Sequence, residues 1–314
     1  MNHKIPLVVI VGATGVGKTD LALESAEELN AEIISADSRL FYRGMDIGTA
    51  KPSLEEQRRV RHHLIDIANP DEIISLGMYQ ELVVRCIQDI NQRGKLAMMV
   101  GGTGQYIRAI TEGWTVPEVV PDPGLRKQIE AEMAEKGLGS LTQRLEKLDP
   151  EYYAIVDRNN HRRIIRALEV ILTTGKRMST QRGKTECPYD VIMIGLTRER
   201  NELYARIDQR IDQMIQYGFV DEVRKLLSCG YDPGLPSMSA IGYGEIVCYL
   251  QGKYTLDEAI TLIKKRTRIL VRRQNNWFKP SDENIHWIKM DDQRKFNLID
   301  TVLSQVNREL RHAE

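Results

Sequence analysis

The sequence predicts an α/β fold, in which helices flank a parallel sheet and a helical insertion interrupts the chain. Short apolar segments alternate with amphipathic ones over the first hundred residues, which is typical of consecutive β-α-β units. A glycine-rich P-loop pattern directly follows the first apolar segment. Prolines and charged helical stretches replace this rhythm from residue 117, and the rhythm returns near residue 189. We therefore expect a core of residues 1–116 and 189–314 and an insertion of residues 117–188.

The strands are predicted from short apolar runs. Residues 5–11 and 96–100 are continuous apolar runs that end at glycines, as expected for strands buried on both faces. Residues 32–36 are expected to form a second, shorter strand. After the insertion, residues 189–196 and 285–288 are the apolar runs that we expect to return to the sheet.

The helices are predicted from apolar residues spaced three and four apart. This spacing is clear in the segment that follows the P-loop, and in a longer amphipathic segment that Gly94 ends. The helical segments of the insertion have strongly charged faces. We expect helices over residues 18–30, 76–92, 124–148, 159–174, 200–229 and 256–278.

Composition excludes several classes of protein. The 314 residues include 44 Lys and Arg and 44 Asp and Glu, so net charge favours no class of partner. The sequence has no apolar run as long as a membrane span and no signal-peptide core at its start, so we expect no membrane association. The 4 cysteines are widely spaced, which indicates reduced thiols in a cytoplasmic protein.

Two basic clusters stand out within this neutral chain. Residues 264–273 contain six Lys and Arg, and residues 158–166 contain four Arg and a His, with no acid in either stretch. A basic helix face is often simply solvated. Two such clusters together favour a polyanionic partner.

The P-loop pattern is the clearest chemical signal. Its glycines allow backbone N–H groups to converge on phosphate oxygens at the start of a helix. Lys18 would add a positive charge at the terminal phosphate, and the hydroxyl of Thr19 could bind Mg²⁺. The alternative is a glycine-rich turn before an ordinary helix. The predicted phosphate-binding residues are Gly12, Ala13, Thr14, Gly15, Val16, Gly17, Lys18 and Thr19.

Two further features follow predicted strands. Asp37 comes just after the second strand, where it could serve as a general base, bind Mg²⁺ or simply form a turn. Val100 is followed by Gly101, Gly102 and Thr103, which permit close approach of a ligand. No predicted core strand ends in a clear Walker B acid, which argues against an ATPase.

Two arginines could bind a diphosphate. Arg206 and Arg210 lie one helical turn apart on a predicted helix and therefore share a face. The alternative is a solvated face on which they pair with Asp208 or Asp212. Residues 42–52 are small and polar, which favours a loop over a site.

The motifs together resemble those of the bacterial tRNA dimethylallyltransferases, also called tRNA isopentenyltransferases. The similarity extends essentially from end to end, and the stretch Gly-Met-Asp-Ile-Gly-Thr-Ala-Lys-Pro is much more specific than the P-loop. The segments that carry the resemblance are residues 12–19, 35–38, 42–52, 63–66, 100–103 and 163–170.

The resemblance implies a P-loop kinase-like core in which the loop binds the diphosphate of dimethylallyl diphosphate instead of ATP. The dimethylallyl group would pass to N6 of the adenosine next to the 3′ side of the anticodon. Asp37 corresponds to the general base, Thr103 to a contact of the reacting nucleotide and Arg210 to a diphosphate-binding arginine. Mg²⁺ on Thr19 would assist, and the enzyme would act as a monomer in the cytoplasm.

The resemblance also implies a binding surface for the tRNA anticodon stem-loop that includes the insertion and both basic clusters. The target base would have to leave its stack to reach a buried pocket. The residues that correspond to tRNA contacts are Asp37, Ser38, Arg39, Leu40, Thr103, Arg126, Arg162, Arg163, Ile164, Ile165, Arg166, Tyr243, Arg272, Arg273, Gln274, Trp277 and Lys279.

The sequence departs from the family pattern in two places. The family commonly has Arg where this chain has Ser239, and Arg-Gln where it has Gly244-Glu245. Asn159-Asn160-His161 replaces a frequent Asn-Asp-Pro. Three other functions remain alternatives: a P-loop small-molecule kinase, an adenylate isopentenyltransferase that makes a cytokinin from AMP, and an RNA-binding regulator with a vestigial P-loop.

Overall fold

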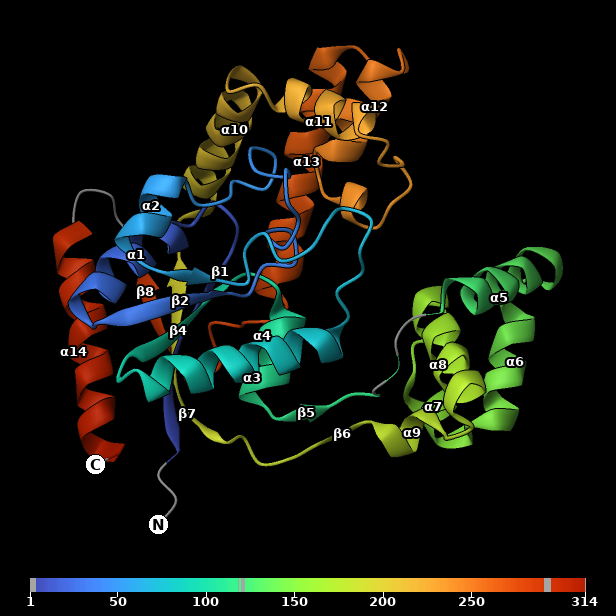
Figure 1. The fold of residues 1–314 in the computed structure, drawn as a ribbon, viewed down its shortest axis with the longest axis horizontal. Helices are drawn as coiled ribbons and strands as arrows, with labels where there is room; N and C mark the ends of the chain where they lie inside the picture. Colours follow the sequence, from blue (N-terminus) through green and yellow to red (C-terminus); the bar gives the residue numbers. More distant parts are fainter. Residues whose placement is uncertain (1–3, 118, 120–121, 291–294, 314) are drawn as a thin grey trace. The chain divides into compact units, whose positions relative to one another are not determined.

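A six-stranded parallel sheet forms the centre of the computed structural model, which describes residues 4–117, 119, 122–290 and 295–313 (Figure 1). The strand order is β3-β2-β4-β1-β7-β8, and every pairing is parallel. The predicted α/β class with a parallel sheet is therefore confirmed. The strands are β1 (Ile5–Gly12), β2 (Ala31–Ser35), β3 (His62–His63), β4 (Leu96–Gly101), β7 (Tyr189–Thr197) and β8 (Ile285–Lys289).

The centre of the sheet is almost completely apolar. Strand β1 lies between β4 and β7, and its residues from Leu7 to Val11 are fully buried. Helix α1 (Lys18–Glu28) packs on β2 and β4, and α14 (Lys295–Ala313) packs on α1 and β7. Each Å² of apolar surface that is removed from water stabilises the fold by about 25 cal/mol. Burial of the central strands is therefore the main stabilising feature of this core.

Two predicted long helices are each two helices. Residues 124–148 form α5 (Pro123–Lys136) and α6 (Leu138–Leu148), because Gly137 has a φ of 78° and ends the first helix. Residues 200–229 form α10 (Arg200–Gln216) and α11 (Phe219–Ser228), which Gly218 separates. The other predicted helices correspond to α1, α3 (Leu76–Gln92), α8 (His161–Thr174) and α13 (Leu256–Asn275).

Several short elements were not predicted. Their apolar runs are too brief for a periodicity to show. They are α2 (Leu54–Arg59), α4 (Gly104–Thr111), β5 (Trp114–Thr115), α7 (Pro150–Ile155), α9 (Met178–Gln181), β6 (Gly183–Lys184), η1 (Ser237–Ser239) and α12 (Tyr243–Leu250), together with β3. The C-terminal α14, which has 19 residues, was not predicted either.

The chain divides into two compact units. One comprises residues 1–74, 81–107 and 188–314, and the other residues 75–80 and 108–187. The second unit has its own apolar core, to which Ile164, Leu168 and Leu141 contribute fully buried side chains. The division begins at residue 108, whereas the sequence led us to expect an insertion from residue 117.

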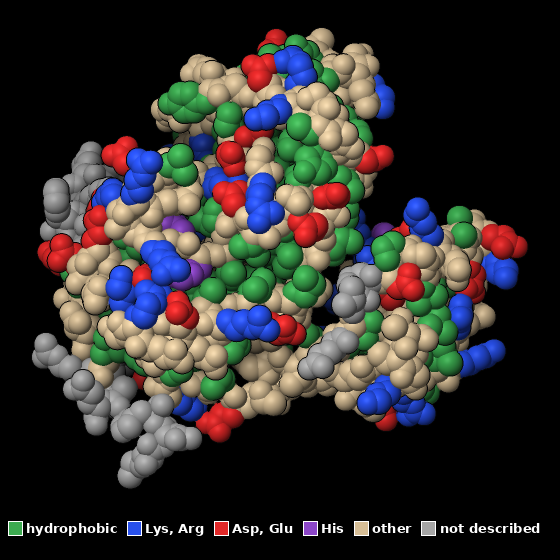
Figure 2. Space-filling model, in the orientation of Figure 1, with side chains coloured by type: hydrophobic (Ala, Val, Ile, Leu, Met, Phe, Trp, Pro, Cys, Tyr) green, Lys and Arg blue, Asp and Glu red, His purple; other side chains and the backbone are tan. Residues whose placement is uncertain are grey.

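The surface has a mixed charge. On the face shown in Figure 2, Lys and Arg side chains are interspersed with Asp and Glu, in keeping with a formal net charge of zero. Among the described residues, every helix is too short or too polar to cross a lipid bilayer.

Candidate active site

Three neighbouring strands bring the predicted catalytic groups to one edge of the sheet. Strands β2, β4 and β1 are adjacent and parallel, so the segments that follow them meet at their carboxyl ends. The N–H of Thr103 donates to the carbonyl of Ala36 (3.2 Å), and the N–H of Ser38 lies 3.4 Å from the Thr103 hydroxyl, which accepts. A Cβ at Gly101 would lie 2.3 Å from the carbonyl oxygen of Ala36, so the close approach of these two loops requires glycine.

The P-loop connects β1 to the N-terminus of α1. Lys18 is the first residue of α1, and its Nζ donates to the carbonyls of Gly12 (3.0 Å) and Ala13 (2.9 Å). Burial lowers the pKa of Lys18 to about 8; the charge of Arg210 also lowers it, and that of Asp37 opposes the change. An ammonium group that is poorly solvated gains more from an incoming anion than an exposed one does. The loop is therefore suited to a diphosphate.

Arg206 and Arg210 of α10 both interact with the P-loop. Nε of Arg206 donates to the carbonyl of Gly15 (3.3 Å). Burial lowers the pKa of Arg210, and the nearby charge of Asp37 raises it. The sequence left open that these arginines pair with Asp208 or Asp212. Both acids form ion pairs with α13 instead, Asp208 with Arg268 and Asp212 with Lys264.

Asp37 lies between the cations and the Thr103 loop. Its Oδ1 accepts from the N–H of Arg39 (2.9 Å), and its own N–H donates to the Ser35 hydroxyl (3.3 Å). This Asx-turn fixes the carboxylate in a half-buried position. Its charge acts on both Lys18 and Arg210, so the site places one anion beside two cations.

Arg39 ties the Asp37 loop to the short helix η1. Its guanidinium donates to the carbonyls of Pro236 (3.0 Å) and Ser237 (3.4 Å) and to the hydroxyl of Ser239 (3.3 Å). Ser239, one of the departures from the family pattern, therefore has a structural partner. Contact of Arg39 with RNA stays a prediction.

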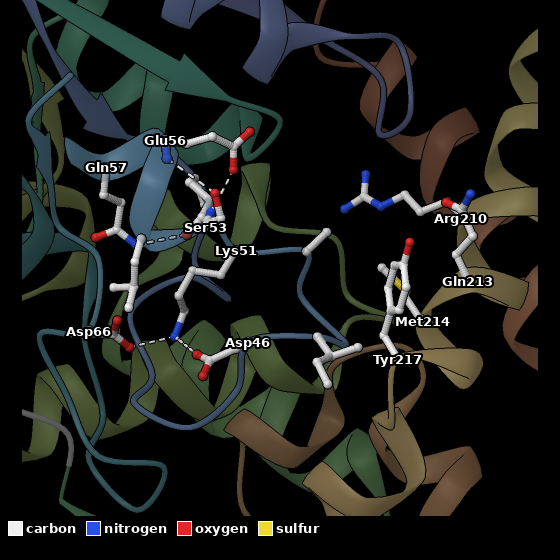
Figure 3. Close-up of a pocket in the computed structure, with 14 residues that line it drawn as sticks. Asp46, Lys51, Ser53, Glu56, Gln57, Asp66, Arg210, Gln213, Met214 and Tyr217 are labelled. Atoms are coloured by element: carbon white, nitrogen blue, oxygen red, sulfur yellow. Dashed lines mark hydrogen bonds and ion pairs between the residues drawn. The ribbon is translucent and has the colours of Figure 1, made fainter. Parts of the chain in front are cut away.

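A cavity of about 510 Å³ lies between residues 46–57, which comprise a polar loop and the start of α2, and the C-terminal half of α10 (Figure 3). Lys51 organises the loop, because its Nζ donates to carboxylate oxygens of Asp46 and Asp66, each at 2.5 Å. On the opposite side, Arg210, Gln213 and Met214 of α10 line the cavity together with Tyr217, which caps the C-terminus of this helix. Arg210 therefore lines this cavity and also acts electrostatically on Lys18 of the P-loop.

The first residues of this loop are bound by a carboxylate of α11. The Glu222 carboxylate accepts from the N–H groups of Asp46, Ile47 and Gly48 and from the hydroxyl of Tyr243. Tyr243 is fully buried, and burial raises the pKa of its phenol. Its side chain therefore supports the loop from inside, and we expect any effect on tRNA binding to be indirect.

The basic cluster of α13 is partly neutralised. Lys264, Arg266 and Arg268 pair with Asp212, Glu245 and Asp208. Arg272 and Arg273 are exposed, as are Trp277 and Lys279. Gln274 is buried, and its side chain contacts the P-loop.

The predicted residues of the insertion form a separate group. Arg162 and Arg163 are exposed, whereas Ile164 and Ile165 lie in the core of this unit. Glu169 is fully buried and accepts from Arg126 (2.8 Å), from Arg166 (2.8 Å) and from the N–H of Asp122 (3.0 Å). The side chains of Ile164 and Ile165 stabilise the helix that presents the arginines, and their direct contact with RNA stays a prediction.

Sequence reasoning missed three acidic or basic residues that organise the site. Lys51, Glu222 and Glu169 each hold several groups in place from a buried or half-buried position. Lys51 and Glu169 lie within the segments that carry the family resemblance, which is the signal that could have identified them. Glu222 lies outside every such segment, so nothing in the sequence indicated its role.

Comparison with known proteins is consistent with this geometry. A family model described as IPP transferase matches residues 40–281. The tRNA dimethylallyltransferase of Roseiflexus sp. (strain RS-1) is 51% identical over 275 residues, which cover 88% of this chain and 90% of the relative. The tRNA dimethylallyltransferase of Halalkalibacterium halodurans is 44% identical over 295 residues, which cover 92% of this chain and 92% of the relative.

Solved structures agree. The full-length tRNA isopentenylpyrophosphate transferase of Bacillus halodurans is similar with a TM-score of 0.71 at 40% identity, covering 98% of this chain and 99% of that chain. The structure of a eukaryotic dimethylallyltransferase acting on tRNA is similar with a TM-score of 0.78 at 25% identity. The similarity covers 96% of this chain and 77% of that chain. The resemblance seen in the sequence is confirmed, and this chain belongs to the IPP transferase family.

Proposed function

We propose that this enzyme transfers the dimethylallyl group of dimethylallyl diphosphate to N6 of the adenosine that follows the anticodon of a tRNA, releasing diphosphate. The observation that carries the proposal is that β2, β4 and β1 end side by side, which brings Asp37, Thr103 and the P-loop to one edge of the sheet, where the charges of Asp37 and Arg210 act on Lys18. The names of the relatives support the same reaction. An adenine amino group is a weak nucleophile, so the reaction depends on activating the allyl donor.

The protein's largest task is to stabilise the negative charge that grows on the departing diphosphate. Cleavage of the allylic C–O bond leaves a resonance-stabilised cation and places both bonding electrons on the diphosphate oxygen. Lys18, Arg210 and the P-loop N–H groups would receive this charge. As N6 bonds to the allyl carbon, the Asp37 carboxylate takes the N6 proton. Thr103, whose hydroxyl accepts the N–H of Ser38, would contact the reacting nucleotide.

Mg²⁺ fits the donor groups at the P-loop. Thr19 is exposed at the first turn of α1 and offers a hydroxyl oxygen. Mg²⁺ prefers oxygen ligands and commonly combines few protein groups with substrate phosphates and water. We propose that Thr19 holds the ion, which would neutralise part of the diphosphate charge. The cavity beside Arg210 would admit the diphosphate substrate to this position.

The tRNA would bind through the exposed arginines of the insertion and of α13. Phosphate neutralisation by these side chains would make affinity fall as salt rises. Action as a monomer in the cytoplasm stays a prediction from the family resemblance.

Glu169→Gln is expected to weaken stem-loop binding roughly tenfold and to leave the KM for dimethylallyl diphosphate unchanged. A Gln carbonyl could still accept from Arg126 and Arg166, but its NH2 group would face the N–H of Asp122, and both bonds would lose charge assistance, which contributes about 1.5–3 kcal/mol per bond. Fluorescence titration of an anticodon stem-loop would measure the effect. Glu130→Gln, at an exposed position on α5, is the matched control. Unchanged stem-loop affinity in Glu169→Gln would contradict this role.

The reaction is tested by transfer of labelled dimethylallyl from its diphosphate, with Mg²⁺, to an unmodified anticodon stem-loop. AMP and ATP are supplied in parallel reactions. Label in the stem-loop supports the proposal. Label in AMP alone would indicate an adenylate isopentenyltransferase, and ATP turnover without label transfer would indicate a small-molecule kinase.

A further inference from the structure

Gln274, which the sequence placed among the RNA contacts, lies with its side chain inside the protein. It belongs to the last turn of α13, and the residue is only 9% exposed. Its Oε1 accepts from the N–H of Thr14 in the P-loop (2.8 Å), and its Nε2 donates to the carbonyl of Gly102 (3.3 Å). Both ends of a buried amide are thus engaged, one on each of the two loops that form the site.

The bond to Thr14 determines which P-loop amides remain for a ligand. A backbone N–H that donates to Gln274 is committed to holding the loop. Arg206 fastens the carbonyl of Gly15, the next residue, from α10. The P-loop is therefore held from two helices, and a loop that is already ordered loses less entropy when an anion binds.

The bond to Gly102 holds the second loop, which carries Thr103. Trp277, about one turn further along, packs closely on Gly104, where an added Cβ would lie 2.1 Å from the indole Cγ. Arg272 and Arg273 are exposed on the same turn as Gln274. The end of α13 therefore contacts both active-site loops on one face and presents cations on another.

We infer that Gln274 is a positioning residue that joins the diphosphate loop to the Thr103 loop, and that it does not bind RNA directly. This inference rests on the proposed function. Its effect is specific: the amide sets the P-loop conformation that diphosphate needs, and it leaves the exposed RNA-binding cations of α13 in place.

The test compares binding of inorganic diphosphate and of an anticodon stem-loop to the whole protein. Gln274→Met keeps the approximate shape of the side chain and removes both hydrogen bonds. We expect its Kd for diphosphate, measured by calorimetry with Mg²⁺, to rise roughly three- to tenfold. A change of this size corresponds to the loss of about one or two hydrogen bonds. Its Kd for the stem-loop should change less than twofold. Asn275→Met, at the exposed neighbouring position, should change neither.

The opposite pattern would overturn the inference. If Gln274→Met binds diphosphate normally and loses stem-loop affinity, Gln274 is an RNA contact. If both affinities fall in parallel with the melting temperature, its role is structural only. Should Gln274→Met not fold, Gln274→Asn replaces it: this variant keeps an uncharged amide whose side chain is one methylene shorter, so it cannot reach both loops at once, and it should also weaken diphosphate binding selectively. Failure of the wild-type protein to bind diphosphate would contradict the proposed function instead.

Discussion

Replacing Asp37 by asparagine is expected to lower kcat by about 10²–10⁴, the range typical of a lost general base. The amide oxygen can still accept the N–H of Arg39, so the turn that holds the side chain should persist. What is lost is the basicity needed to take the N6 proton. Single-turnover transfer to a stem-loop, with saturating dimethylallyl diphosphate, measures this chemical step directly.

The control for this variant is Asp71→Asn, which removes a carboxylate from an exposed position. Its rate should equal that of the wild type. A loss of less than about fivefold in Asp37→Asn would be well below the range of general bases and would mean that another group takes the proton.

Lys18→Met is expected to reduce kcat by about 10²–10³, as the loss of one transition-state anion contact commonly does. The Nζ lies at the carbonyls of Gly12 and Ala13, and burial lowers its pKa to about 8. Charge developing on the diphosphate therefore meets an ammonium that is only partly solvated. Rates with saturating stem-loop and donor measure the effect on kcat separately from affinity.

Lys225→Met, on the exposed face of α11, is the matched control and should leave the rate unchanged. A variant that raises only the KM for dimethylallyl diphosphate would indicate that Lys18 binds the ground state and the transition state equally.

The sequence was enough to predict which site residues follow the ends of the central strands. An apolar run followed by glycine, lysine and threonine indicates a phosphate loop at the end of a buried strand, and β1 ends at Gly12. Asp37 and Thr103 follow two other apolar runs, so a parallel sheet must place all three segments at one edge. These expectations depend on local pattern and on one rule of topology.

The same local pattern can have more than one physical cause. Ile164 and Ile165 lie within a basic run that matches a tRNA-binding segment, yet they occupy the apolar face of α8 and fill the core of the insertion unit. The apolar spacing on both sides of Gly137 and Gly218 continues through these residues, so each interrupted segment looked like one helix.

The sequence by itself determined the α/β class, the phosphate loop, the candidate base and the family, because each depends on residues that are close together along the chain. Only the tertiary structure decided the strand order that makes Asp37 and Thr103 neighbours, and the contact of Gln274 with a P-loop residue 260 positions away. Such pairings depend on the packing of whole elements, which no short stretch of sequence encodes.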